Sequence, residues 1–128
     1  NKRSPVNMLN AQDLLQDGVY QRLDEERVRF FESTRPEKVD IVRNVNDRLW
    51  TFEVRDSTKN FTKNDWVRVV AVVTDGSFWQ FKGWPFETIV DMFNTVKGIY
   101  FEEVGSMAPK HVTEWAVNIL PMAPYQLQ

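Results

Sequence analysis

One apolar run, Val69 to Val73, constrains the fold of this chain more than any other feature of its sequence. A strand that is apolar on both faces is typical of a parallel sheet, because helices cover both faces of such a sheet. We therefore predict a central strand over Trp66 to Thr74, interrupted only by Arg68. A parallel strand needs a neighbour that is reached through a crossover connection, and the sequence that follows supplies one.

The residues after this run have the pattern of an amphipathic helix, opened by Pro85 and closed by Gly98. Ile99 to Val104 then reads as a second strand. Strand, helix and strand in this order predict a right-handed βαβ unit and place the chain in the α/β class. The predicted apolar face of the helix consists of Phe86, Ile89, Val90, Phe93 and Val96.

The N-terminal part begins with a short helix. Met8, Ala11 and Leu15 recur at helical spacing, and Gly18 supplies a left-handed stop. Beyond it, Asp24 to Phe31 could form a further turn of helix or a loop. This part of the chain predicts one short amphipathic helix ahead of the first strand.

A period of two starts at Lys38 and predicts an antiparallel hairpin with one buried face. Asn46 and Asp47 mark its turn, and the second strand runs from Leu49 to Arg55. We expect this hairpin at one edge of the sheet. The side chains predicted to face inward are Val39, Ile41, Trp50, Phe52 and Val54.

The C-terminal part predicts a turn of helix at Pro109 to Glu114 and a last strand at Trp115 to Leu120, with Pro121 and Pro124 ending regular structure. The whole pattern indicates one domain over residues 1–128, in which helices pack on both faces of a mixed sheet. The residues of the last strand that we expect to point inward are Trp115, Val117 and Ile119.

Composition excludes several kinds of site. Sixteen Lys and Arg against 18 Asp and Glu give a net charge of −2, so neither direct nucleic-acid binding nor an anionic membrane is expected. The absence of cysteine excludes a cysteine nucleophile and cysteine-ligated zinc. The single histidine, His111, could share a helix face with Glu114, but that pair supplies at most two metal ligands. No metal or cofactor is predicted.

The loop from Asp75 to Trp84 follows the predicted central strand, which is where open α/β sheets bind ligands. It contains Ser77, for which the loop supplies no histidine as a base, and four large aromatic residues. These aromatics either pack back onto the domain or form an exposed docking surface. The four are Phe78, Trp79, Phe81 and Trp84.

A nucleotide-binding alternative comes from Thr62-Lys63-Asn64-Asp65, which satisfies the loose [NT]-K-x-D guanine motif. Here the motif precedes a predicted strand, whereas in GTPases it follows one. The sequence also lacks a G-x-x-x-x-G-K-[ST] segment to hold phosphates and magnesium. The alternative to a binding module is therefore a divergent nucleotide-binding hydrolase of the small GTPase type.

The segment Asn64 to Pro85, NDWVRVVAVVTDGSFWQFKGWP, closely resembles the signature of the C-terminal domain of the parafibromin family, whose members are subunits of the RNA polymerase II-associated Paf complex. Weaker similarity extends over most of the chain. Val67 departs from the pattern, because the family usually has an acidic residue there, and both ends are expected to be shortened relative to the family. The resemblance implies a Ras-like fold that has lost nucleotide binding and acts in the nucleus as a non-catalytic interaction domain in transcription elongation and chromatin association.

The partners implied by the resemblance are other Paf complex subunits and RNA polymerase II or elongation factors. Arginine suits bidentate phosphate recognition, so phosphorylated peptides are also considered. Arg68 either reaches the sheet edge or pairs with Asp65 or Glu53. The isolated domain is expected to be a monomer. The candidate partner-binding residues are Arg35, Arg43, Arg55, Arg68, Lys82 and Trp84.

Overall fold

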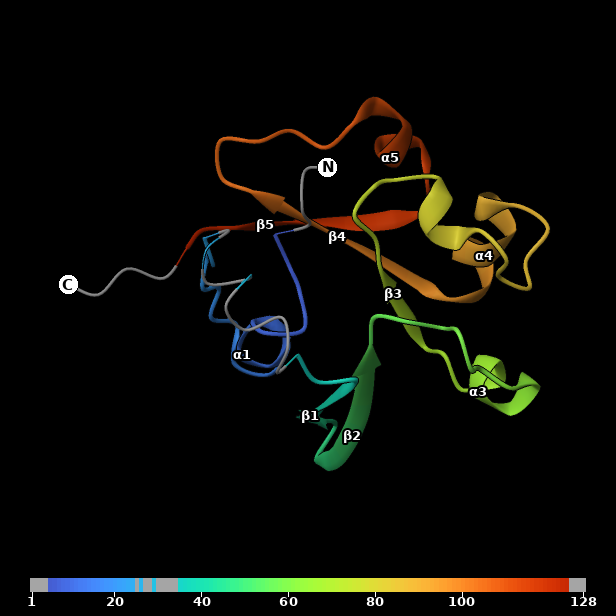
Figure 1. The fold of residues 1–128 in the computed structure, drawn as a ribbon, viewed down its shortest axis with the longest axis horizontal. Helices are drawn as coiled ribbons and strands as arrows, with labels where there is room; N and C mark the ends of the chain where they lie inside the picture. The colour runs from blue at the N-terminus through green and yellow to red at the C-terminus, as the bar shows by residue number, and fades with distance from the viewer. Residues whose placement is uncertain (1–4, 25, 27–28, 30–34, 125–128) are drawn as a thin grey trace. The chain divides into compact units, whose positions relative to one another are not determined.

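A computed structural model describes residues 5–24, 26, 29 and 35–124 of the chain (Figure 1). The chain divides into two compact units, one over residues 1–60 and 123–128 and the other over residues 61–122. The single domain expected from the sequence stays a prediction. Most of the segment Asp24 to Phe31, including Val28 and Phe31, lies outside the described residues.

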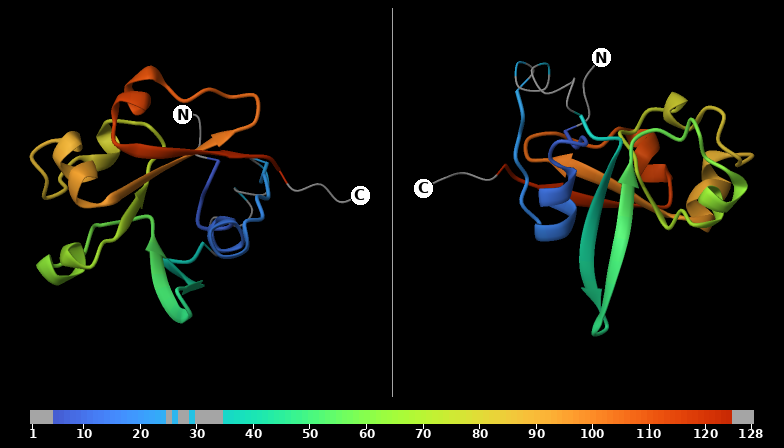
Figure 2. Two further views of the ribbon diagram at one scale, coloured as in Figure 1. Left: turned by 180° about the vertical axis from the view of Figure 1, so that it is seen from behind. Right: turned by 60° about the horizontal axis from the view of Figure 1, so that its bottom comes forward.

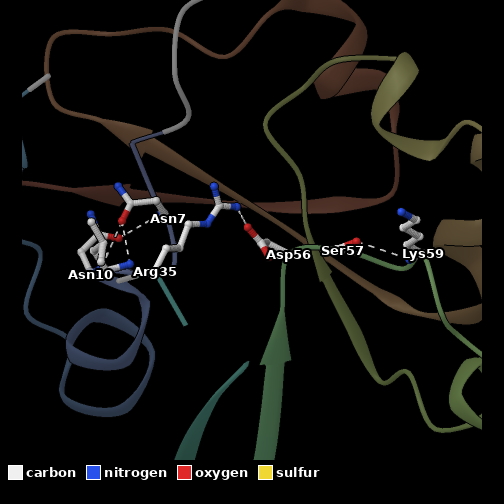
Figure 3. Close-up of polar contacts among 7 residues, drawn as sticks. Asn7, Asn10, Arg35, Asp56, Ser57 and Lys59 are labelled. Carbon is white, nitrogen blue, oxygen red and sulfur yellow. Dashed lines mark hydrogen bonds and ion pairs between the residues drawn. The ribbon is translucent and has the colours of Figure 1, made fainter. Parts of the chain in front are cut away.

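The first unit begins with α1 (Ala11–Asp17), which ends as predicted at Gly18 in the left-handed conformation, with φ at 70°. Leu14, rather than the predicted Leu15, is the buried leucine of this helix. The Asn10 side chain is 1% exposed, and its amide donates to the carbonyl oxygens of Pro5 and Gln21. Figure 3 shows Asn10 beside Asn7, whose backbone N–H donates to the Asn10 amide oxygen at 2.8 Å.

The predicted hairpin is formed by β1 (Lys38–Val45) and β2 (Arg48–Arg55), which pair antiparallel (Figure 2, right). Asn46 and Asp47 both have positive φ angles, 53° and 62°, as a two-residue type I′ turn requires. Ile41 is buried opposite Phe52, which confirms the buried face in that region. The inward orientation predicted for Trp50 is wrong, because this residue lies near the turn and is 43% exposed.

Helix α1 covers the outer edge of β1. The Gln16 side-chain oxygen accepts from the Val42 N–H at 3.0 Å, and the Gln12 amide donates to the Asp40 carbonyl at 3.2 Å. Unpaired strand edges invite association with other strands, and these side chains satisfy groups that would otherwise be open.

The second unit opens with α3 (Lys63–Val67) and continues into β3 (Ala71–Val73). The predicted strand over Trp66 to Thr74 is therefore wrong in its first half. Thr62 caps the helix, with its side chain accepting from the Asp65 N–H while the Asp65 carboxylate accepts from the Thr62 N–H. This capping box favours a helical turn ahead of the β-branched run.

The predicted βαβ unit is confirmed: β3 pairs parallel with β4 (Lys97–Glu103), and α4 (Ile89–Thr95) connects them. A second such unit runs from β4 through α5 (Lys110–Glu114) to β5 (Val117–Met122). The strand order is β3-β4-β5, so β4 is the central strand and β3 is not. A short 3₁₀ helix, η2 (Trp79–Phe81), follows β3.

The α/β class is confirmed, with one difference in the sheets. Strands β1 and β2 form a two-stranded sheet of their own instead of the edge of one mixed sheet. Parallel crossover connections are right-handed as a rule, and for the strand order β3-β4-β5 this rule places α4 and α5 on the same face of their sheet. Helices on the opposite face stay a prediction.

The core of the second unit consists of Val72 from β3 with Met92, Phe93 and Val96 from the α4 region. The prediction that Gly98 ends the helix is wrong, because Gly98 lies buried in β4. A Cβ atom there would be 2.5 Å from both the Phe93 ring and a Val117 methyl group, so the helix packs directly on the strand backbone.

Three smaller sequence predictions are corrected in this unit. Val90 does not join the core and is 58% exposed. Trp115 precedes β5 instead of beginning it. Pro121 lies inside β5 opposite Glu102. The Val104 N–H donates to the Met122 carbonyl, so the backbone groups of Met122 point toward β4. The backbone groups of the preceding residue, Pro121, therefore point away from β4, and on that side the missing N–H donor is tolerated.

Candidate functional site

The loop after β3 is held by the side chain of Gln80. Its carboxamide oxygen accepts from the Thr74 hydroxyl at 2.9 Å and from the Asp75 N–H at 3.1 Å, and its nitrogen donates to the Val73 carbonyl at 3.1 Å. Thr74 is only 3% exposed, so this hydroxyl has little access to water. One side chain therefore fastens the loop to the carboxyl end of the strand.

The same carboxamide takes the place of a neighbouring strand. The Thr74 N–H donates to the Ile99 carbonyl, and the Lys97 N–H donates to the Val70 carbonyl. Because the backbone groups of successive strand residues point to alternate sides, the Val73 carbonyl and the Asp75 N–H point away from β4. In a parallel pair, the N–H and the carbonyl of one residue on the neighbouring strand would bond these two groups. Here the side-chain nitrogen and oxygen of Gln80 bond them instead. The loop thus returns over the end of β3 in a defined position.

The polar residues at the start of the loop form a turn and no catalytic pair. The Asp75 carboxylate accepts from the Ser77 N–H at 2.9 Å and from the Ser77 hydroxyl at 2.7 Å.

Tyr100 lies on β4, and burial, followed by the charges of Glu102 and Asp75, raises its pKa above the ordinary 10.0. These carboxylates thus stabilise the neutral phenol.

His111 holds the other side of the loop. Its Nε2 lies 2.6 Å from the Gly76 carbonyl oxygen, and its ring stacks on Phe78 with a centroid distance of 4.5 Å. The ring also meets Trp115 edge-on at 5.2 Å. His111 is half-buried, and its contacts indicate a structural role in anchoring the aromatic loop.

The four aromatic residues of the loop divide into two pairs. Phe81 and Trp84 pack inward, 5.2 Å apart by ring centroids, and Trp84 also contacts Trp66 at 5.2 Å. Phe78 and Trp79 are 59% and 71% exposed. One pair thus packs back onto the domain and the other pair is exposed, and docking of a partner on the exposed pair stays a prediction.

A pocket of about 160 Å³ lies among the loop, residues 86–88 and the start of α4. Six of its nine lining residues are apolar, four of these are aromatic, and Lys82 and Glu87 contribute one charge of each sign. Such an arrangement can accept an apolar side chain of a peptide. The main lining residues are Phe78, Phe81, Lys82, Trp84, Phe86 and Glu87.

Three candidate arginines lie in the first unit, and each has a partner there. Arg35 forms an ion pair with Asp56 (Figure 3). Arg43 donates to the Gln16 carbonyl oxygen at 3.1 Å. Arg55 donates to Glu53 at 2.7 Å, and this hydrogen bond, with the nearby Lys38, holds the pKa of Glu53 below its ordinary value.

The other three candidates lie in the second unit. Arg68 is exposed and caps the C-terminus of α3, so the prediction that it interrupts the strand is wrong. Glu53, one of its two proposed partners, binds Arg55 and Lys38 instead. Lys82 and Trp84 come together at the pocket. Whether any of the six binds a partner stays a prediction.

Sequence reasoning missed Gln80 as the residue that holds the loop and Glu87 as a charge at the pocket. No local signal marks either, because both roles depend on chain segments that meet only in the fold. The Thr62 to Asp65 match to the guanine motif is accounted for by the capping box of α3.

Within the described residues, no cluster of three or more His, Asp or Glu side chains could hold a metal ion. The helices of this same part of the chain are all too short or too polar to cross a bilayer.

Comparisons with known proteins decide the family. A family model described as "RNA pol II accessory factor, Cdc73 family, C-terminal" matches residues 1–126. The chain belongs to the Cdc73 family. The predicted resemblance to the C-terminal domain of parafibromin is thereby confirmed, and the chain is a domain of an RNA polymerase II accessory factor family.

Several Cdc73 proteins are similar to this chain. Cell division cycle protein 73 of Caenorhabditis elegans is 29% identical over 119 residues, covering 92% of this chain and 23% of that protein. The CDC73 homolog of Arabidopsis thaliana is 32% identical over 124 residues, covering 92% of this chain and 30% of that protein. The chain thus spans less than a third of the length of these relatives.

A solved structure, "The conserved domain of yeast Cdc73", superposes with a TM-score of 0.80 at 27% identity. It covers 98% of this chain, and the match takes in 79% of that one. This Cdc73 domain is Ras-like, which confirms the fold class expected from the sequence.

Proposed function

We propose that this chain is a non-catalytic protein-interaction domain that helps to associate a Paf complex with RNA polymerase II during transcription elongation on chromatin, in the nucleus. The observation that carries the proposal is the match of the Cdc73 family model to nearly the whole chain. Other Paf complex subunits and elongation factors are the further partners proposed.

The chemistry of the loop after β3 supports a binding role over a catalytic one. Ser77 donates to Asp75, His111 bonds the Gly76 backbone, and Gln80 bonds the end of β3. These polar groups hold the loop in shape and leave two exposed aromatic rings beside a pocket. Exposed aromatics next to a pocket are common anchors of protein interfaces.

Lys82 and Trp84 are the proposed contacts in the second unit, and Arg68 is a third cation there. Arg35, Arg43 and Arg55 are the proposed contacts in the first unit, for acidic or phosphorylated segments of a partner. Because each of these three already has a partner within its unit, partner binding there would have to compete with those contacts or extend them.

The test is binding of the purified chain to purified RNA polymerase II and, separately, to reconstituted Paf complex subunits. Trp84 packs against Trp66, so its removal would disturb folding. Lys82→Glu and Trp79→Ala change exposed side chains instead. Lys97→Glu is the matched control, because it makes the same charge change at an exposed position of the same unit.

We expect retention of polymerase or Paf complex subunits by the unchanged chain and by Lys97→Glu, with weaker retention by Lys82→Glu and Trp79→Ala. Retention of none of these proteins would overturn the proposal. A rise in stability of about 2.7 kcal/mol with GTP or ATP and magnesium at a hundredfold excess over Kd would favour the rival hydrolase.

A further inference from the structure

The two faces of the β1–β2 hairpin differ in how their charges are balanced. On one face, Lys38 and Arg55 both contact Glu53, at 3.4 Å and 2.7 Å. Asp40 lies on that face as well, opposite Glu53 in the register. Its cations are therefore matched by carboxylates of the hairpin itself.

The opposite face carries two arginines near the turn and no acidic residue. The register pairs Arg43 with Trp50 and Val45 with Arg48, so these four residues form a square of neighbouring side chains. We call this set the Arg–Trp face. Among the described residues, neither arginine forms an ion pair with a carboxylate, although Asp47 in the adjoining turn directly precedes Arg48 in the sequence.

The two arginines are instead held by uncharged partners. The Arg48 guanidinium lies over the Trp50 ring, 4.4 Å from its centroid, and Arg43 donates one N–H to the Gln16 carbonyl. A guanidinium stacked on an indole keeps its in-plane N–H groups available for a carboxylate. Stacking also orients the group in advance, so less conformational entropy is lost when an anion binds.

Apolar surface adjoins these cations. Trp50 is 43% exposed and Val45 is 46% exposed, although both belong to a strand pair whose other end is buried. Two unneutralised cations beside two exposed apolar side chains complement a segment that carries both carboxylates and an apolar side chain.

We propose that the Arg–Trp face is a docking surface for an acidic peptide segment in which aspartate or glutamate alternates with large apolar residues. The carboxylates of the segment bind Arg48 and Arg43, and an apolar side chain packs on Trp50 and Val45. The identity of the protein that supplies the acidic segment rests on the proposed interaction role of this chain. The binding of an acidic peptide to the Arg–Trp face does not, because it can be measured by itself.

The size of the face favours a peptide over a nucleic acid. Cross-strand neighbours lie about 5 Å apart and alternate residues of one strand about 7 Å apart, so the face holds one or two anionic groups. Single-stranded nucleic acid binds along a longer basic track. Asp47 at the turn and Asp40 and Glu53 on the other face interrupt any such track on this hairpin.

The experiment measures binding of a fluorescein-labelled peptide that alternates Glu and Asp with Leu and Phe to the purified 128-residue chain. The same peptide with Gln and Asn in place of its acids serves as the uncharged probe. The variants are Arg48→Glu, Arg48→Lys and Trp50→Ala. Lys59→Glu is the matched control, because it makes a similar charge reversal at an exposed position of the same unit.

We expect the acidic peptide to bind, and Arg48→Glu to weaken it by about tenfold or more, since a hydrogen bond to a charged group contributes about 1.5–3 kcal/mol. Arg48→Lys should restore part of the affinity and Lys59→Glu should leave it unchanged. Circular dichroism would show that each variant is folded. No binding, equal binding of the uncharged peptide, or equal losses in Arg48→Glu and Lys59→Glu would overturn the proposal, as would a preference for a phosphopeptide or an RNA oligomer that depends on Arg48.

If the acidic peptide binds through the Arg–Trp face while polymerase and Paf complex subunits are not retained, the surface stands and the proposed function fails. If these proteins are retained by Arg48→Glu as strongly as by the unchanged chain and the peptide does not bind, the function stands and the surface is refuted.

Discussion

Replacing Gln80 by alanine tests the role of its carboxamide in fastening the aromatic loop. The change removes three hydrogen bonds, to Thr74, Asp75 and Val73. Each contributes about 0.5–1.5 kcal/mol net. Water can replace the bond to the exposed Asp75 N–H, but the Thr74 hydroxyl, 3% exposed, loses its acceptor. We therefore expect the free energy of unfolding to fall by about 2–3 kcal/mol.

Urea unfolding followed by tryptophan fluorescence measures this loss. Trp50 is the only one of the five tryptophans outside residues 61–122, so the signal reports mainly on the unit that contains Gln80. With a urea dependence of about 1–3 kcal/mol per molar, the unfolding midpoint should fall by about 1 M or more. Asn118→Ala removes a side-chain amide from an exposed position of the same unit and should change the midpoint little.

Gln80→Glu removes the side-chain N–H donor of residue 80 and keeps its oxygen acceptor, so it tests the donated hydrogen bond separately. The new carboxylate can still accept from the Thr74 hydroxyl and the Asp75 N–H, but one of its oxygens meets the Val73 carbonyl oxygen, to which it can donate only when it is protonated. Repulsion between these two oxygens favours the protonated form, so the deficit should be largest at neutral pH and shrink as pH falls toward about 4. A loss below about 0.5 kcal/mol for Gln80→Ala, or a deficit of Gln80→Glu that does not depend on pH, would refute the reasoning.

Three further predictions follow from the packing and the titrating groups. Gly98→Ala should destabilise the chain by about 2–3 kcal/mol in urea unfolding, because its Cβ would meet Phe93 and Val117 at 2.5 Å; an unchanged midpoint would contradict the packing of α4 on β4. The hydrogen bond from Arg55 is the main cause that lowers the pKa of Glu53. The ionised Glu53 should therefore stabilise the chain above its ordinary pKa of 4.5, and this stabilisation should be lost as pH falls below that value. Glu53→Gln should abolish that component of the acid unfolding curve. Tyr100 should titrate above pH 10 in ultraviolet absorbance, and its contribution to stability should be lost as pH rises through that raised pKa; Tyr100→Phe should remove the late absorbance change, and a titration at the ordinary value would contradict its burial.

Local sequence signals predicted the elements that depend on neighbouring residues. The Asn46-Asp47 turn sets the register of the hairpin, because two adjacent residues with positive φ suit a type I′ turn. Gly18 ends α1 for a similar local reason. The apolar run before a helical pattern and another strand predicted the parallel β3–β4 pair. The α/β class followed from that order of elements alone.

Local signals failed where two of them competed. The run from Trp66 to Val73 has strand composition throughout, but the capping box of Thr62 and Asp65 starts a helix and leaves only Ala71–Val73 as strand. Gly98 has the composition of a helix stop, but its lack of a side chain serves the close approach of Phe93. The first outcome depends on which of two local signals prevails, and the second depends on which side chain is nearby in space.

By itself, the sequence determined the α/β class, the hairpin register and the family, because each is written in neighbouring residues or in a contiguous motif such as Trp79 to Pro85. The tertiary structure alone decided which aromatics of the loop are exposed, since alternation does not reveal which side the core occupies. It also decided that Gln80 bonds the end of β3, that His111 bonds Gly76, and that Arg48 stacks on Trp50 without a carboxylate partner among the described residues. The physical reason is that hydrogen bonds, ring contacts and charge balance depend on distances of a few ångströms, which only the folded chain sets.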